Sequence, residues 1–104
     1  MLIYTIEISK TPSSGTVSFN TPKFDAGLLK HIYLKSASVD TTFDVKITDS
    51  RGNNIIDTSV SGESPVGIFN KFYDMPLKEI HTVYIFNSSA DELFTGKISI
   101  MEES

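Results

Sequence analysis

Two histidines are the first residues in this sequence that could do chemistry. His31 and His81 each lie near the start of a predicted strand, so the two rings could approach each other on neighbouring strands. Two histidines and a carboxylate can bind a metal such as zinc. A metal site also needs a cavity, a fixed geometry and outer contacts that orient the ligands, so we favour two solvated histidines at strand ends. We therefore expect no metal and no other cofactor.

A loop rich in oxygen atoms is the second candidate. Calcium needs several oxygens that converge from one loop. The segment "DSRGNN" offers side-chain oxygens from Asp49, Ser50, Asn53 and Asn54, but Arg51 places a positive charge in the middle. A turn whose aspartate and asparagine side chains cap their own backbone explains the same residues, and we favour it.

Acidic residues could also hydrolyse a glycosidic bond, which needs two carboxylates flanking a cleft. Four candidates each fall on a predicted outer face or in a loop, and no pair stands out: Glu7, Asp44, Asp57 and Glu63. The sequence lacks a phosphate-binding glycine loop, a G-x-S-x-G segment and an H-E-x-x-H segment, and it supports no Ser–His–Asp arrangement. We therefore predict that the protein is not an enzyme.

Alternating apolar and polar residues indicate the elements that must position any site. In "TTFDVKITDSRGNNIID", Phe43, Val45 and Ile47 share one face of a strand, and Gly52 suits a hairpin turn. No segment shows a helical period over two or more turns. The predicted strands cover residues 2–9, 16–20, 28–36, 41–49, 54–60, 81–89 and 95–103, with 21–27 as a loop, 68–77 as a short strand or an irregular crossover, and 90–94 as a turn or one helical turn.

Short strands at intervals of about ten residues predict an all-β fold. We expect an antiparallel β-sandwich of jelly-roll type with about eight strands. Because no repeat or linker interrupts the chain, residues 1–104 are predicted to form a single domain. The residues expected on the inner faces are Tyr4, Ile6, Phe19, Ile32, Leu34, Phe43, Val45, Ile47, Ile85, Ile98 and Ile100.

Composition limits the classes of partner. The 104 residues include no cysteine, which excludes disulfides and cysteine-based zinc sites and favours an intracellular or virus-assembled setting. A net charge of −4 argues against nucleic-acid binding. No apolar run is long enough to span a membrane, and we expect no membrane partner. The first ten residues, "MLIYTIEISK", alternate as a strand does and lack the basic region of a signal peptide.

An aromatic segment, "GIFNKFYDMP", is the strongest candidate for a contact surface. Phe69, Phe72 and Tyr73 crowd into a stretch with no clear period. Exposed aromatic rings could stack on a sugar or anchor a partner protein. The alternative, which we favour, is that they plug the open end of the sandwich.

The late strand "TVYIFNSS" is apolar on both faces. Val83 and Ile85 fall on one side, and Tyr84 and Phe86 fall on the other. A strand of this kind must be covered on its outside, either by a loop of the same chain, such as 67–76, or by a neighbouring subunit. We expect a homo-oligomer, a trimer or a dimer, with an interface that involves Phe69, Phe72, Tyr73, Tyr84 and Phe86.

Residues 31–102 resemble small β-sandwich proteins encoded among the structural genes of tailed bacteriophages. The similar parts are the "TTFDVKITDSRGNNI" hairpin, an "MPL" segment before the late strand, and "NSSADELFTGKISIME" at the end. In that group an Asn–Ser or Asn–Ala step follows the late strand, as at Asn87, and a phenylalanine precedes the last strand, as Phe94 does. The hairpin order also resembles the jelly-roll domains appended to secreted bacterial peptidases.

The resemblance implies a virion component, located in the particle after assembly in the host cytoplasm. Such a protein would decorate the capsid, form a head fibre, or belong to the tail or adsorption apparatus. It would act as a symmetric oligomer in contact with other virion proteins. The alternative hypothesis is a β-sandwich module that binds a carbohydrate or another ligand.

Overall fold

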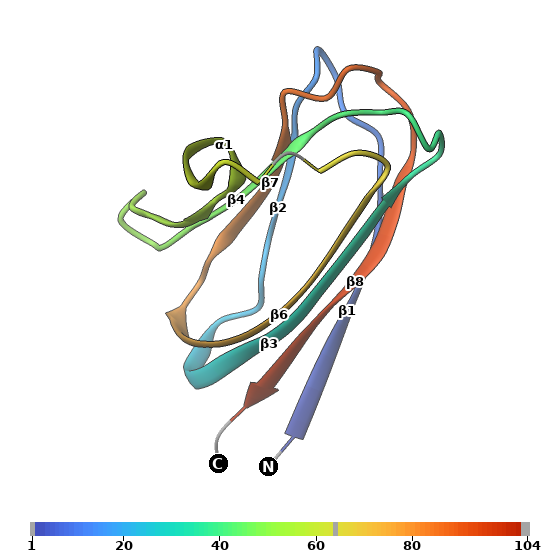
Figure 1. The fold of residues 1–104 in the computed structure, drawn as a ribbon. Helices are drawn as coiled ribbons and strands as arrows, with labels where there is room; N and C mark the ends of the chain where they lie inside the picture. The colour runs from blue at the N-terminus through green and yellow to red at the C-terminus, as the bar shows by residue number, and fades with distance from the viewer. Residues whose placement is uncertain (1, 64, 103–104) are drawn as a thin grey trace.

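The structure, a computed structural model, describes residues 2–63 and 65–102. The described residues form eight strands and one short helix, shown in Figure 1. Their bounds are β1 Leu2–Lys10, β2 Val17–Asn20, β3 Phe24–Ser36, β4 Asp44–Thr48, β5 Asn54–Asp57, α1 Thr58–Ser61, β6 Ile68–Glu79, β7 Thr82–Phe86 and β8 Phe94–Glu102.

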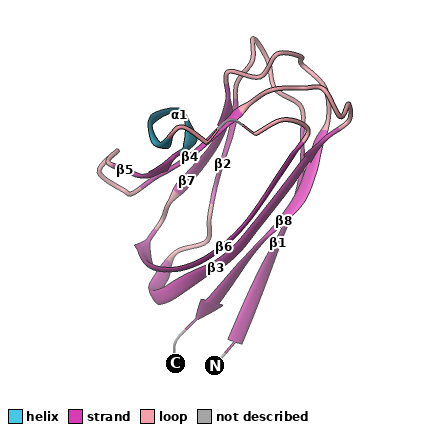
Figure 2. Cartoon of the chain, viewed as in Figure 1, coloured by secondary structure: helices cyan, strands magenta, loops and turns pink. Residues whose placement is uncertain are grey.

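The strands form two antiparallel sheets that face each other, as Figure 2 shows. One sheet has the order β1-β8-β3-β6 and the other the order β2-β7-β4-β5. Only the β4–β5 hairpin joins neighbours within a sheet, and every other connection crosses to the opposite sheet. Two interlocked Greek keys of this kind make a jelly roll. The predicted fold class is therefore confirmed.

The core lies between the sheets and follows the alternation in the sequence. Ile6 and Phe19 are half-buried and pack against it. Tyr4 was expected inside but is exposed: it lies near the start of β1, where β1 and β8 run past the facing sheet in Figure 1, and its ring packs edge-on against Phe24. The remaining eight predicted core residues are at most 2% exposed: Ile32, Leu34, Phe43, Val45, Ile47, Ile85, Ile98 and Ile100.

The close approach of β8 to β3 requires a glycine at one point of the β1-β8-β3-β6 sheet. Gly96 on β8 lies opposite Leu34 of β3 and Ile8 of β1. A Cβ atom at Gly96 would lie 1.8 Å from the carbonyl oxygen of Tyr33. Only a residue without a side chain lets β8 pass β3 at this distance.

Several element predictions were wrong in part; the strand predicted at 41–49 begins only at Asp44, and the one at 81–89 ends at Phe86. The segment 21–27 is not all loop, because β3 already begins at Phe24, whose ring is buried. The segment 54–60 is a strand only as far as Asp57, which caps α1 by accepting a hydrogen bond from the backbone N–H of Ser59. The segment 90–94 contains no helical turn, and Phe94 already belongs to β8.

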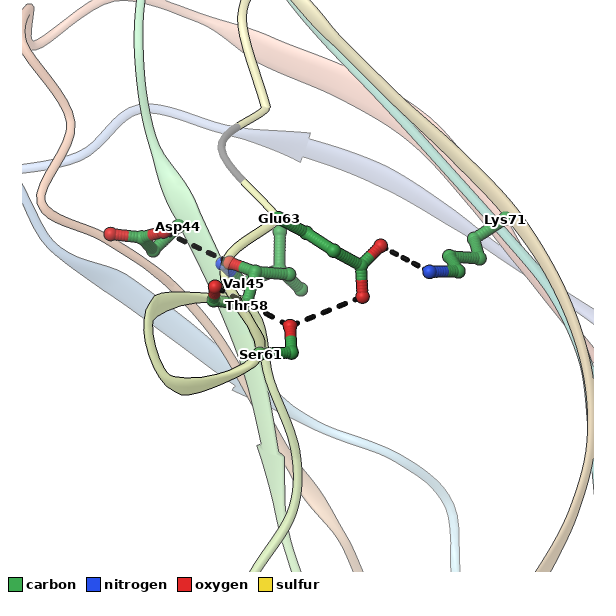
Figure 3. Close-up of polar contacts among 6 residues, drawn as sticks. All are labelled: Asp44, Val45, Thr58, Ser61, Glu63 and Lys71. Atoms are coloured by element: carbon green, nitrogen blue, oxygen red, sulfur yellow. Dashed lines mark hydrogen bonds and ion pairs between the residues drawn. The ribbon is translucent and has the colours of Figure 1, made fainter.

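The segment 68–77 lies within one continuous strand, which has a register shift against β3, and the irregular crossover was a wrong alternative. β6 alternates along its whole length, with Phe69, Tyr73 and Leu77 facing inward. The pattern was hard to see because an inward position holds a charge, Lys71. That side chain pairs with Glu63 from the connection after α1, as Figure 3 shows. An inward charge on an edge strand discourages pairing with a foreign strand.

Candidate functional site

The clearest candidate for a contact surface lies along β6, at the edge of its sheet. Ile68 and Phe72 lie on the outer face of the strand, with one outward-facing residue between them. Their side chains are 49% and 75% exposed. Val39 and Val66 lie in loops beside the start of β6 and are also largely exposed. Together with Ile68 they line a small hollow of about 120 Å³. We call these four residues the β6 apolar surface.

A histidine supports the exposed ring of Phe72. A register shift in β3 between Leu29 and His31 places His31 opposite Phe72 on β6. The two rings stack with centroids 4.3 Å apart and an angle of 10° between their planes. His31 Nε2 lies 2.5 Å from Asn70 Oδ1 on the same outer face. The result is a flat aromatic platform with hydrogen-bonding groups at its side, held on two paired strands.

The other aromatic residues of the 67–76 segment face the opposite way. Phe69 is 5% exposed and belongs to the core. Tyr73 is half-buried and packs against the core. Burial, and to a lesser extent the Glu63 carboxylate, raises the pKa of Tyr73 to about 12. Within this segment, Phe72 is therefore the aromatic side chain that the structure presents to solvent.

Tyr84 and Phe86 lie on the outer face of the other sheet, on β7. Both are half-buried, while Val83 and Ile85 between the sheets are fully buried. The Lys46 ammonium of neighbouring β4 lies 4.7 Å from the Tyr84 ring centroid and 5.0 Å from that of Phe86. The segment 67–76 does not cover these rings, because it belongs to the opposite sheet. The five residues expected at one interface are thus not brought together.

The four carboxylates considered for glycosidic hydrolysis do not flank a common cleft. Glu7 is exposed on β1. Asp44 accepts hydrogen bonds from Thr58 and Asn87, and Asp57 accepts bonds from Ser59 and Asn54. Glu63 pairs with Lys71, which lowers the pKa of its carboxyl group. Three of the four are therefore engaged in holding the local structure.

Two further acids, in the loop before β8, join three loops at one end of the sandwich. Asp91 accepts hydrogen bonds from the backbone N–H groups of Ser14 and Gly15. Glu92 accepts bonds from Ser38 and from the hydroxyl of Thr41, and these bonds lower its pKa. The 90–94 segment is ordered by these contacts to other loops, which a local sequence pattern does not reveal.

The two histidines lie beside different sheets and do not face each other. His31 lies on the outer side of β3, and His81 precedes β7 and is 4% exposed. In the described part of the chain, no three histidine, cysteine or acidic side chains gather in a way that could hold a metal. The hypothesis of a shared metal site at His31 and His81 was wrong, because it assumed that the two segments were neighbouring strands.

The "DSRGNN" segment is the capped turn that we favoured. Asp49 Oδ1 accepts hydrogen bonds from the backbone N–H groups of Arg51 and Asn53, each at 2.9 Å. The Asn53 bond is the main cause of the lowered pKa of Asp49. Gly52 supplies a φ of 83° to close the turn. Both oxygens of the Asp49 carboxylate thus accept hydrogen bonds within the turn itself.

Comparison with known proteins adds little to this description. No model of a protein family matches the chain, and no curated protein matches it. Among solved structures, the chain is similar to a chain in the structure of the Gt strain of infectious bursal disease virus, at 14% identity and a TM-score of 0.38. The match covers 98% of this chain and 33% of that one. At this TM-score it carries no argument, and the jelly-roll assignment rests on the strand order alone.

No helix among the described residues could span a membrane. The one helix there, α1, has four residues, and none of the described helices is long and apolar enough to span a bilayer.

Proposed function

We propose that this domain is a non-catalytic structural component of a bacteriophage particle, and that it acts through contacts with neighbouring proteins, including further copies of itself. The β6 apolar surface is the observation that carries the proposal. Four exposed aliphatic or aromatic side chains gather along one edge strand and the loops beside it. Exposed apolar patches of this kind often mark interaction sites.

Three further arguments support the proposal. The jelly roll is a common fold of viral capsid proteins, although lectins and cupins also use it, so the fold alone does not assign a function. The sequence of residues 31–102 resembles small phage structural proteins. Three of the four carboxylates considered for hydrolysis are engaged in capping and pairing, which supports a non-catalytic role.

The direct experiment is to look for the chain in purified particles. An epitope-tagged chain is expressed from the viral genome that encodes it, and particles are separated on a density gradient. We expect the tag to sediment with genome-filled particles and to resist a high-salt wash. A chain that stays entirely at the top of the gradient contradicts the proposal, as does a coding sequence that lies outside any viral structural gene cluster.

One observation favours a second candidate, carbohydrate binding. The exposed Phe72 ring, supported by His31 and flanked by Asn70, offers a flat apolar face beside hydrogen-bonding groups. A sugar ring could stack on such a platform. A glycan array separates the two functions: binding that is lost in Phe72→Ala and kept in Ile68→Ala favours the sugar module. Tyr73, which we had grouped with Phe72 for this role, faces inward and is unsuitable as a test.

A further inference from the structure

A cavity of about 550 Å³ opens between the β4–β5 turn and the end of β6. It lies away from the β6 apolar surface and is independent of the proposed function. Its size falls within the range of about 300–1,000 Å³ that is usual for small-molecule sites. The lining residues are Asp49, Ser50, Arg51, Asn53, Ile55, Pro76, Lys78, Glu79 and His81.

His81 is the unusual member of this lining. Its side chain is buried, and neither ring nitrogen has a hydrogen-bond partner among the described residues. The backbone is fixed in place, because the N–H of His81 donates to Thr21 Oγ1 and the N–H of Thr21 donates to the His81 carbonyl. Burial lowers the pKa of the imidazole, which favours the neutral ring with one donor and one acceptor. Buried polar groups normally have a partner.

The charges around His81 are unequally compensated. Asp49 uses its oxygens on the backbone and side chain of its own turn. Glu79 lies 3.7 Å from the Lys23 ammonium. Arg51 and Lys78 form no ion pair within the described residues. The cavity lining therefore holds two cations that form no ion pair, Arg51 and Lys78, together with the carboxylates of Asp49 and Glu79 and a neutral imidazole whose nitrogens have no partner among the described residues.

The walls of the cavity are held in fixed conformations. Arg51 belongs to the capped turn, where its own N–H is bonded to Asp49. On the opposite wall, Glu79 has a φ of 68°, an uncommon value for a residue with a side chain. Backbone conformations of this kind concentrate at functional sites. A constrained backbone at these two positions lowers part of the entropic cost of binding a ligand between them.

We propose that this cavity binds a small oxyanion, either a carboxylate or a phosphate, between Arg51 and Lys78, with His81 as a hydrogen-bonding partner inside. The arginine fork pairs with two oxygens of such a group, and the lysine ammonium adds a point charge. Both imidazole nitrogens are buried in the unliganded protein, so a small rotation of the ring must accompany the bond to a polar atom of the same ligand. Ile55 and Pro76 form the apolar part of the wall.

The test is an NMR titration that observes the imidazole nitrogens of His81. The probes are sodium phosphate and sodium glucuronate, with glucose as the neutral counterpart of glucuronate and sodium chloride at matched ionic strength. We expect saturable shifts of the His81 resonances with at least one of the two anions and none with glucose or chloride. Which anion saturates identifies the oxyanion as carboxylate or phosphate.

Two exposed variants locate the binding without endangering the fold. Arg51→Gln and Lys78→Gln should each weaken binding by at least about tenfold. Lys97→Gln, an exposed change on β8, should leave it unchanged. The proposal is overturned if neither anion gives a saturable shift, if chloride gives the same shift, or if both variants bind as the unaltered protein does.

Discussion

The hydroxyl of Thr58 accepts a hydrogen bond of 2.9 Å from the backbone N–H of Val45. Thr58 is completely buried, and its hydroxyl donates in turn to Asp44 Oδ1 at 3.0 Å, as Figure 3 shows. The contact lies where the chain leaves the β4–β5 ladder, whose last pair is Lys46 with Asp57. A side chain of α1 thus satisfies a strand N–H that β5 no longer reaches.

Replacing this hydroxyl should therefore destabilise the sandwich. Thr58→Val keeps the shape of the side chain but leaves the Val45 N–H buried without an acceptor, which costs about 1–3 kcal/mol. Urea unfolding followed by fluorescence or circular dichroism measures the change. Val60→Ala, an exposed position in the same helix, is the control and should change the free energy of unfolding by less than about 0.5 kcal/mol. Equal changes in the free energy of unfolding for the two variants would show that the Thr58 hydrogen bonds do not contribute to stability as proposed.

The close contact of β8 with β3 leads to a second prediction, for the effect of a substitution at Gly96 on stability. A methyl group in Gly96→Ala would collide with the Tyr33 carbonyl, so the strands must separate, at a cost of about 3 kcal/mol or more. Gly52→Ala is the comparison, because it has open space and only an unfavourable φ, which costs about 1–2 kcal/mol. In thermal unfolding, the melting temperature of Gly96→Ala should lie well below that of Gly52→Ala. The reverse order would contradict the strand geometry.

The buried His81 predicts a dependence of stability on pH. Its pKa in the folded state lies below its ordinary value of 6.5, so the unfolded chain binds the proton more readily. Stability should be full above pH 6.5 and should fall as the pH decreases from there toward the lower folded-state pKa. His81→Gln should flatten the curve in this range. The lowered pKa values of Asp49 and Glu92 act at more acidic pH, below their ordinary values of 3.8 and 4.5. A curve that rises on acidification below 6.5 would contradict this assignment.

Self-association is expected from the β6 apolar surface. Light scattering should give a mass of two or three times the 11.5 kDa chain. Phe72→Lys should shift the protein toward the monomer, because it places a charge on the exposed ring position. Thr5→Lys makes a comparable change in the same cross-strand row, at the opposite edge of the sheet, and should not. A protein that remains monomeric at high concentration would remove the support for self-assembly and favour the carbohydrate-binding alternative.

Period-two alternation predicted most of the fold, because most strands bury one face and leave the other in water. It failed on β6, where Lys71 faces inward and Ile68 and Phe72 face outward, so the pattern is masked by an ion pair and by exposed apolar side chains. It also failed at Thr58, where a buried hydroxyl replaces a ladder bond. Both exceptions depend on contacts between segments, which no local pattern reports.

The candidate site was predictable only in part for the same reason. Phe72 was recognised as a candidate from the crowding of aromatic residues, but which of its neighbours share its face depends on the register of β6 against β3. The partner of Phe72 in the stack, His31, was expected to be a solvated histidine near a strand end. Val39 and Val66 join the surface through two loops that are distant in the sequence. Their proximity follows from the jelly-roll topology.

Incorporation into particles tests the central claim most directly. Quantitative mass spectrometry of gradient-purified particles would count copies of the chain in virus carrying the unaltered gene, Phe72→Lys or Thr5→Lys. We predict many copies per particle for the unaltered chain and for Thr5→Lys, and a large loss for Phe72→Lys, although all three proteins fold in isolation. Absence of the unaltered chain from particles, or equal incorporation of both variants, would contradict the account.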